Sequence, residues 1–194
     1  MLSLSTLVEE RRSAALLDPE LPGPDFDEVK SLVGLAILAP NHKYTFPWRF
    51  HVAFGEDRKE LGRLFAEEAR ARDWAAEGTE HREAQKLLRA PVLIFVGMVT
   101  DPINPIRRQE DLLACGAAIE NLLLLFQERG YDAMWRTGRM TASQAIPAAL
   151  GYEAGEETVG ILYVGRRPAT FSPPPRRRPP VDDVISCGLV GARS

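Results

Sequence analysis

The sequence predicts an α+β protein, and three segments carry that prediction. Residues 91–99 form a continuous apolar run of strand length, which is typical of a central strand covered on both faces. Residues 48–54 alternate apolar and polar side chains, as a half-buried strand does. Residues 109–129 have the pattern of a long helix, which ends at Gly130. A chain of 194 residues with 45% hydrophobic content can bury one core around these segments.

Two helices are predicted before the first strand. The first covers residues 5–16, with Ser5 as its N-cap. The second opens at Asp25, because Glu28 follows three residues later at the spacing of a capping box. Pro40 cannot continue this helix, so the chain enters a polar loop before the first strand. Apolar positions at helical spacing predict one buried face on the second helix: Val29, Leu32, Val33 and Ala36.

The remaining elements follow from composition and periodicity. The long helix at 109–129 is apolar nearly all round, so we expect every side of it to be buried. Either it lies between a sheet and other helices, or it forms a surface shared with a second subunit. The other predicted elements are charged surface helices over 57–89 that break near Gly78, strands near 131–136 and 158–165, and a short helix around 143–150.

Charge and cysteine content exclude several classes of function. A formal charge of -3 and a pI near 5.7 give no general attraction to nucleic acid or to anionic lipid. The apolar runs are shorter than the roughly 20 residues of a membrane span. Cys115 and Cys187 form neither a CxxC pair nor a zinc motif, and the N-terminus is a charged helix. We therefore expect a soluble cytoplasmic protein without nucleic-acid or membrane partners.

Arg11, Arg12 and Ser13 are the first candidate binding residues. Two guanidinium groups and a hydroxyl are the donor set that a phosphate dianion needs. The alternative is that the arginines simply complement the dipole at a helix C-terminus.

Asn41 and His42 are the second candidates, since the loop at 40–47 can present side chains to a ligand. They could equally be turn formers, because asparagine tolerates turns and loop histidines are often merely exposed.

The third candidates follow two predicted strands. Trp135-Arg136-Thr137-Gly138 places an aromatic ring, a cation, a hydroxyl and a glycine at a strand end, although a core tryptophan and a turn would look the same. Arg166 and Arg167 follow the last strand, where they could neutralise a phosphate or be solvated; the second reading is favoured for Arg167. No metal site is predicted, because no histidine has a partner at ligand spacing. GxGxxG, GxxxxGK[ST] and GxSxG motifs are absent.

Taken in order along the chain, these segments resemble the FMN-dependent nitroreductase family, in particular its compact single-domain branch. The resemblance implies a three-layer α/β/α sandwich with a central mixed, mainly antiparallel sheet, and an intertwined homodimer with FMN at the subunit interface. It makes residues 1–194 one FMN-binding domain whose residues 170–194 are an extended C-terminal tail. The matching segments are Arg11-Arg12-Ser13, residues 39–43, Pro47-Trp48-Arg49-Phe50, the long apolar helix, Trp135-Arg136-Thr137-Gly138, and Gly165 with Pro168.

The same resemblance implies the roles of the candidate residues. Arg11, Arg12 and Ser13 would contact the FMN of their own subunit, whereas Asn41 and His42 would reach it from the other subunit. Residues 135–138 would line the flavin, and Arg166 would hold the phosphate. Two positions depart from the branch, which can carry an arginine where Leu38 stands and often a serine where Thr137 stands.

The implied activity is that of an FMN-dependent NAD(P)H oxidoreductase. NADH or NADPH would reduce the flavin, and nitroaromatic or quinone-type acceptors would reoxidise it by a ping-pong mechanism. The chemistry would belong to flavin N5, so no catalytic residue is expected. Two alternatives stay open: a flavin-binding module without turnover, and a different flavin reaction on the same scaffold.

Overall fold

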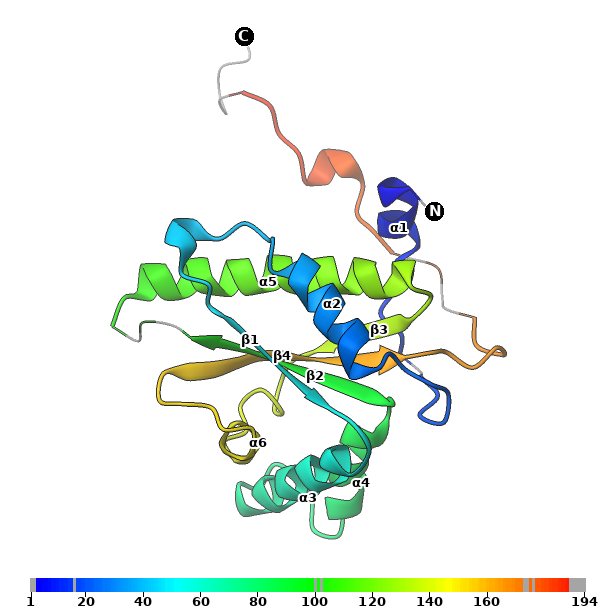
Figure 1. Ribbon diagram of the computed structural model, residues 1–194, viewed down its shortest axis with the longest axis vertical. Helices are drawn as coiled ribbons and strands as arrows, with labels where there is room; N and C mark the ends of the chain where they lie inside the picture. The colour runs from blue at the N-terminus through cyan, green and yellow to red at the C-terminus, as the bar shows by residue number, and fades with distance from the viewer. Residues whose placement is uncertain are drawn as a thin grey trace.

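A four-stranded sheet with the order β1-β2-β4-β3 forms the centre of the protein (Figure 1). The computed structural model describes residues 3–15, 17–99, 101, 103–172, 175 and 177–188. The strands are β1 (Trp48–Ala53), β2 (Val92–Val99), β3 (Asp132–Arg136) and β4 (Glu156–Gly165).

The named strands all pair in antiparallel fashion. The register of β2 against β4 shifts between Val96 and Gly97. A parallel contact is added at the β3 edge of the sheet, where Ser13 forms an isolated bridge with Ala133. The predicted mixed but mainly antiparallel sheet is therefore confirmed, and the bridge places the N-terminal candidate residues beside β3.

Helices cover both faces of the sheet, which makes the three predicted layers (Figure 1). One layer holds α2 (Phe26–Ala36) and α5 (Pro105–Glu128). The other holds α3 (Gly55–Ala71), α4 (Glu80–Gln85) and α6 (Ala145–Ala149). The N-terminal helix α1 (Leu4–Glu10) lies by the end of α5, where the Gln127 side chain donates to the Leu7 carbonyl at 3.2 Å. Short 3-10 turns are η1 (His42–Tyr44), η2 (Lys86–Leu88) and η3 (Val181–Asp183).

Strand β2 joins the cores of the two helical layers. Ile94 and Val96 pack in the cluster that contains α2 and α5 side chains, whereas Leu93 and Phe95 pack in the cluster under α3 and α6. All four side chains are fully buried. This explains why the sequence of β2 is a continuous apolar run and confirms its predicted central position.

The predicted extent of the first helix was wrong. Its N-cap is Ser3, whose hydroxyl accepts from the Thr6 N–H, and the helix ends at Glu10. Arg11 leaves the helical region with φ -54° and ψ 128°, and the following backbone pairs with β3 through Ser13. Backbone pairing at the sheet edge outweighs local helix propensity here, as tertiary context often does.

The long helix α5 is confirmed but begins earlier than predicted. Asn104 caps it by accepting from the Arg107 N–H, and Pro105 occupies the first turn. The expectation that every side is buried does not hold in the single chain. One face packs on the sheet, whereas Leu113 is 66% exposed.

Most of the other predicted elements are confirmed with small shifts of their ends. Asp25 caps α2 by accepting from the Glu28 N–H. The 57–89 segment does form two helices, α3 and α4, which are separated around Gly78. Both strands predicted in the C-terminal half and the short helix between them are present as β3, β4 and α6.

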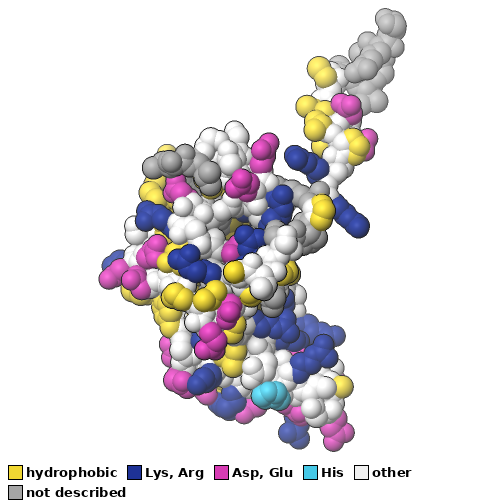
Figure 2. Space-filling view, turned by 90° about the vertical axis from the view of Figure 1, so that its right-hand side faces the viewer, with side chains coloured by type: hydrophobic (Ala, Val, Ile, Leu, Met, Phe, Trp, Pro, Cys, Tyr) yellow, Lys and Arg dark blue, Asp and Glu magenta, His cyan; other side chains and the backbone are white. Residues whose placement is uncertain are grey.

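The C-terminal segment stands away from the body of the protein (Figures 1 and 2). The η3 turn and the two residues that follow it expose three apolar side chains, Val181, Val184 and Ile185. The extended run expected over 173–180 falls partly outside the described residues, as does the end of the 170–194 tail. Among the described helices, none is long and apolar enough to cross a membrane.

Candidate functional site

Arg11 and Arg12 lie where the chain leaves α1 and passes toward the edge of β3. The Arg11 Nε atom is 3.2 Å from the Glu120 carboxylate of α5, and the Arg11 side chain is only 19% exposed. Arg12 donates instead to backbone, at 2.6 Å to the Glu9 carbonyl and 3.0 Å to the Arg11 carbonyl. Next to them, the Ser13 backbone bridges Ala133 and leaves its side chain exposed. The N-terminal donors are therefore fixed to both α5 and β3.

A polar pocket of about 180 Å³ opens beside these arginines. Its volume is well above the roughly 10–15 Å³ that one water requires. Three guanidinium groups and two carboxylates contribute to its walls, which leaves an excess of positive charge suited to an anion. The lining residues are Glu10, Arg11, Arg12, Leu123, Gln127, Tyr131, Asp132, Ala133 and Arg167.

Arg167, not Arg166, lines this pocket. The Arg167 Nε atom is 2.8 Å from the Asp132 carboxylate, which also accepts from the Arg167 backbone N–H. Arg166 donates to the Gly130 carbonyl at 3.0 Å and stacks 4.6 Å from the centre of the Tyr131 ring. The local sequence does not indicate which of these two adjacent arginines lines the pocket. The pairing of Asp132 with Gly165 does distinguish them, because it brings the start of β3 next to the residues that follow β4.

The β3 candidates form a second group on the same strand. Trp135 is 39% exposed and lies over Gly160 of β4, where a Cβ atom would stand only 2.0 Å from the indole Nε1. The Arg136 guanidinium lies 5.4 Å from the centre of the Tyr163 ring. Burial raises the pKa of Tyr163 to about 12, although the Arg136 charge opposes the rise.

Thr137 and Gly138 follow β3 in an exposed turn. Gly138 has φ +92°, a conformation that favours glycine. Its carbonyl accepts from both the backbone N–H and the hydroxyl of Thr141, at 3.0 and 2.8 Å. Both residues therefore remain accessible beside Trp135.

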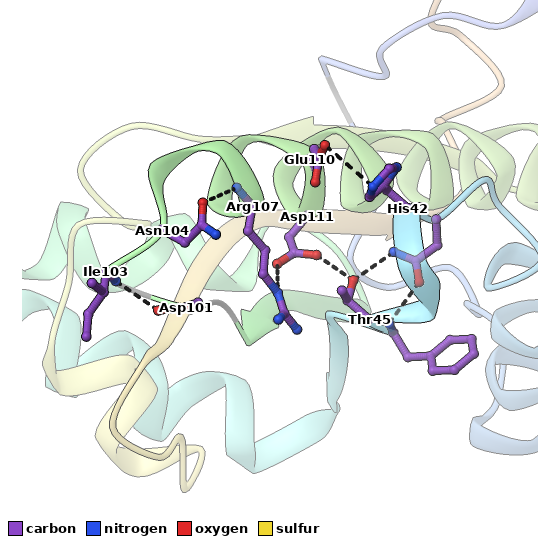
Figure 3. A network of polar contacts seen from close by, with 10 residues as sticks. His42, Thr45, Asp101, Ile103, Asn104, Arg107, Glu110 and Asp111 are labelled. Carbon is purple, nitrogen blue, oxygen red and sulfur yellow. Dashed lines mark hydrogen bonds and ion pairs between the residues drawn. The ribbon is translucent and has the colours of Figure 1, made fainter.

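The 41–46 loop holds Asn41 and His42 in different ways (Figure 3). Asn41 uses its side chain within the loop: its Nδ2 donates to Thr45 Oγ1, and its Oδ1 accepts from the Phe46 N–H, both at 2.9 Å. The His42 side chain is 54% exposed and has Glu110 of α5 at 3.9 Å. Of the two, His42 is therefore the side chain presented outward.

The fold brings the N-terminal candidates close to the β3 candidates and keeps the 41–46 loop apart from both. Ser13 bridges Ala133, only two residues before Trp135 on β3. The loop instead meets α5 at Glu110, ten residues before the Glu120 that pairs with Arg11. At 1.5 Å per helical residue, those contacts are about 15 Å apart along α5.

Comparison with protein families matches residues 8–166 to the Nitroreductase family. The chain belongs to the nitroreductase family. Relatives include "Putative NAD(P)H nitroreductase YdjA" of Escherichia coli (strain K12), 26% identical over 167 residues, which are 84% of this chain and 87% of that protein. "Putative NAD(P)H nitroreductase YfhC" of Bacillus subtilis (strain 168) is 26% identical over 182 residues, covering 93% and 91%.

Solved structures of nitroreductase-family proteins have the same fold. A nitroreductase-like family protein from Bacillus cereus superposes with a TM-score of 0.80 at 29% identity, and 96% of each chain is covered. A "putative nitroreductase in complex with fmn" from Desulfovibrio desulfuricans gives a TM-score of 0.71 at 21% identity over 97% of this chain and 99% of that one.

Within this nitroreductase-family chain, the pocket is lined by Asp132 and Ala133 of β3, and Trp135 follows on the same strand. The guanidinium groups suit a phosphate, and Trp135 offers an aromatic face next to an open turn. No cluster of three or more His, Cys, Asp or Glu side chains suited to a metal ion occurs among the described residues. The arrangement can bind a phosphorylated ligand that carries a flat ring system.

Proposed function

We propose that the protein is an FMN-dependent NAD(P)H oxidoreductase that reduces nitroaromatic or quinone-type acceptors by a ping-pong mechanism. The observation that carries the proposal is the polar pocket formed by Arg11, Arg12 and Arg167 at the β3 edge, next to Trp135. The relatives named as NAD(P)H nitroreductases and the FMN complex of a protein with the same fold support it.

The residues present fit FMN. Guanidinium groups form charge-assisted hydrogen bonds with phosphate. Among the described residues, carbonyl oxygens are the acceptors that hold Arg12, and no carboxylate there pairs with its positive charge. Residues 135–138 would offer the ring system an aromatic face, a cation and backbone donors, and Trp135, Thr137 and Gly138 are exposed. We place Arg167 in the phosphate role proposed for Arg166, because Arg167 lines the pocket.

When bound, FMN would supply hydride transfer at its N5 atom. The chain would hold the cofactor and favour its reduction, since cations along the pyrimidine edge stabilise negative charge near N1. Arg136, whose guanidinium lies 5.4 Å from the centre of the Tyr163 ring, is the cation that we propose for this edge. No side chain has to gain or lose a proton for this role.

The second part of the proposal is a homodimer that completes each flavin site. Within one chain, His42 lies about 15 Å along α5 from the Arg11 contact, so it would meet the FMN of the other subunit. A largely apolar groove of about 380 Å³ between α1, α2 and α5 is available for the contact. Large exposed apolar residues on these elements and the following loop are Leu4, Val8, Leu35, Leu38, Tyr44, Phe46 and Leu113.

An absorbance spectrum of the purified protein tests the proposal directly. We expect flavin absorbance and its bleaching by anaerobic NADH or NADPH, followed by recovery on addition of a quinone. Initial rates at varied donor and acceptor concentrations should then give parallel double-reciprocal lines. A protein that stays colourless after incubation with FMN would reject the proposal, and intersecting lines would reject the ping-pong mechanism.

A flavin-binding module without turnover is the alternative function. The accessible turn at Thr137 and Gly138 leaves room for a second molecule beside the ring, which favours turnover. Flavin absorbance that neither nicotinamide bleaches would instead favour the module.

A further inference from the structure

The 41–46 loop is held in a conformation that its own residues disfavour. Lys43 and Tyr44 have φ +53°, and Phe46 has φ +47°. All three lie in the left-handed region, where a Cβ atom meets the backbone, and none is a glycine. Such a conformation persists only when surrounding contacts determine it, and strain of this kind is concentrated at functional sites.

A chain of three side chains supplies those contacts (Figure 3). Asn41 binds the Phe46 N–H through Oδ1 and donates from Nδ2 to the Thr45 hydroxyl. That hydroxyl in turn donates to Asp111 Oδ1 of α5 at 2.5 Å. Each group thus has a defined donor or acceptor role, and consecutive bonds of this type polarise and strengthen one another. We call this series the Asn41-Thr45-Asp111 chain.

Asp111 is an unusual anchor, because it is only 1% exposed on a helix whose outer face is open. A buried carboxylate is costly unless it is paired and hydrogen-bonded. Arg107 lies one turn earlier, with its Nε 3.8 Å from the carboxylate, so the short bond from Thr45 is the closer contact. The bond from Thr45 therefore ties this buried carboxylate to the loop in its left-handed conformation.

We propose that Asp111 is a positioning residue for the flavin-binding loop, acting through Thr45 and Asn41 to fix the direction in which His42 is presented. The inference rests on the proposed function, in which His42 reaches the FMN of the other subunit. Asp111 itself is buried and acts through its hydrogen bond from Thr45. Glu110 cannot serve this purpose, because its 3.9 Å contact with His42 is solvent-exposed and long.

A pair of substitutions at Thr45 tests the proposal. Thr45→Val keeps the shape but removes the hydroxyl, which leaves the buried Asp111 oxygen without its short bond. We expect the FMN dissociation constant to rise about tenfold. We also expect faster hydrogen-deuterium exchange of the Phe46 amide in the protein freed of FMN. Thr45→Ser retains the hydroxyl and should restore both values to within about threefold of the wild type.

Ser143→Ala is the matched control. Ser143 also donates a hydroxyl hydrogen bond to a carboxylate, that of Glu68, but in the layer on the other side of the sheet. It should lower the global stability without changing the FMN dissociation constant or the exchange of Phe46. The comparison separates loss of loop geometry from general loss of a buried hydrogen bond.

Two results would overturn the inference. One is wild-type FMN affinity and Phe46 exchange in Thr45→Val; the other is an equal loss of affinity in Thr45→Val and Ser143→Ala. Absence of FMN binding by the wild type would reject the proposed function and the flavin role of the loop together. Normal wild-type binding with an unchanged Thr45→Val variant would reject the positioning role alone.

Discussion

The two N-terminal arginines differ in the partners that hold them. Arg11 is paired with the carboxylate of Glu120, which already balances part of its charge. Within the part of the chain that the structure describes, Arg12 donates to the carbonyls of Glu9 and Arg11, and these oxygens carry no net charge. Arg12 therefore retains more of its attraction for a phosphate, and its removal should weaken cofactor binding more than folding.

Arg12→Ala is expected to raise the FMN dissociation constant by roughly 10- to 150-fold, which corresponds to about 1.5–3 kcal/mol for a charged hydrogen bond. Fluorescence titration of the FMN-free protein measures the constant, and urea unfolding measures stability. Arg70→Ala on α3 is the control, because that side chain is 77% exposed in the opposite layer. An affinity equal to that of the control would remove Arg12 from the site.

At the scale of single residues, the sequence located the arginines but not their partners. The place of Arg11, Arg12 and Ser13 after the first helix was visible in the sequence; in the structure the two arginines line the polar pocket and Ser13 pairs with Ala133. The choice between Arg166 and Arg167 was not visible, since it depends on Asp132 and Tyr131 of neighbouring β3. The internal use of the Asn41 amide likewise depends on Thr45 and on a helix distant in sequence.

Among the elements, α6 is anchored by a carboxylate from another helix. Glu68 of α3 accepts from the Ser143 hydroxyl and from the backbone N–H groups of Gln144 and Ala145. Burial alone would raise the pKa of Glu68, but these hydrogen bonds outweigh it and leave the pKa lowered. The charged carboxylate is thus more stable in the folded protein than in the unfolded chain.

The contribution of this anchor should depend on pH. Because the folded pKa is depressed, the stabilisation is present above the unfolded pKa of roughly 4.3 and is lost as the pH falls through the folded value. Ser143→Ala should lower the free energy of unfolding by about 1–3 kcal/mol at neutral pH and by less as the pH falls below about 4. Urea unfolding at several pH values measures the difference, and a difference that does not change with pH would contradict the assignment.

Element ends were harder to predict than element types. The periodicity of α2 and the apolar run of β2 are local, so both were predictable. The end of α1 was not, because pairing of Ser13 with β3 competes with the helix and requires a strand more than one hundred residues later. The start of α5 was missed although Asn104 and Pro105 are a cap and first-turn pair that the sequence displays.

On the scale of the whole molecule, the single chain leaves one side of its longest helix uncovered. Leu113 is 66% exposed on α5, and a largely apolar groove borders the same helix. On the face in Figure 2, acidic and basic side chains are interspersed. The apolar composition of α5 is therefore explained if a second copy covers this side, which the sequence alone had left as one of two alternatives.

Leu113→Glu should weaken the proposed dimer, because it places a charge in a surface that would be desolvated on association. We expect light scattering to show a larger fraction of monomer and FMN titration to show weaker binding in the same samples. Lys59→Glu on α3 changes charge in the opposite layer and should alter neither property. A wild-type chain that is monomeric with FMN bound would contradict the shared site.

The contact between Trp135 and Gly160 also constrains how this scaffold can vary. The indole crosses the neighbouring strand only because position 160 lacks a side chain, since a Cβ atom would stand 2.0 Å from Nε1. A substitution that adds a Cβ atom at position 160 therefore requires a smaller side chain at position 135. A smaller side chain at position 135 in turn leaves space for a side chain at position 160. The side chains at the two positions therefore limit each other in size, and a change at one alters the packing between β3 and β4.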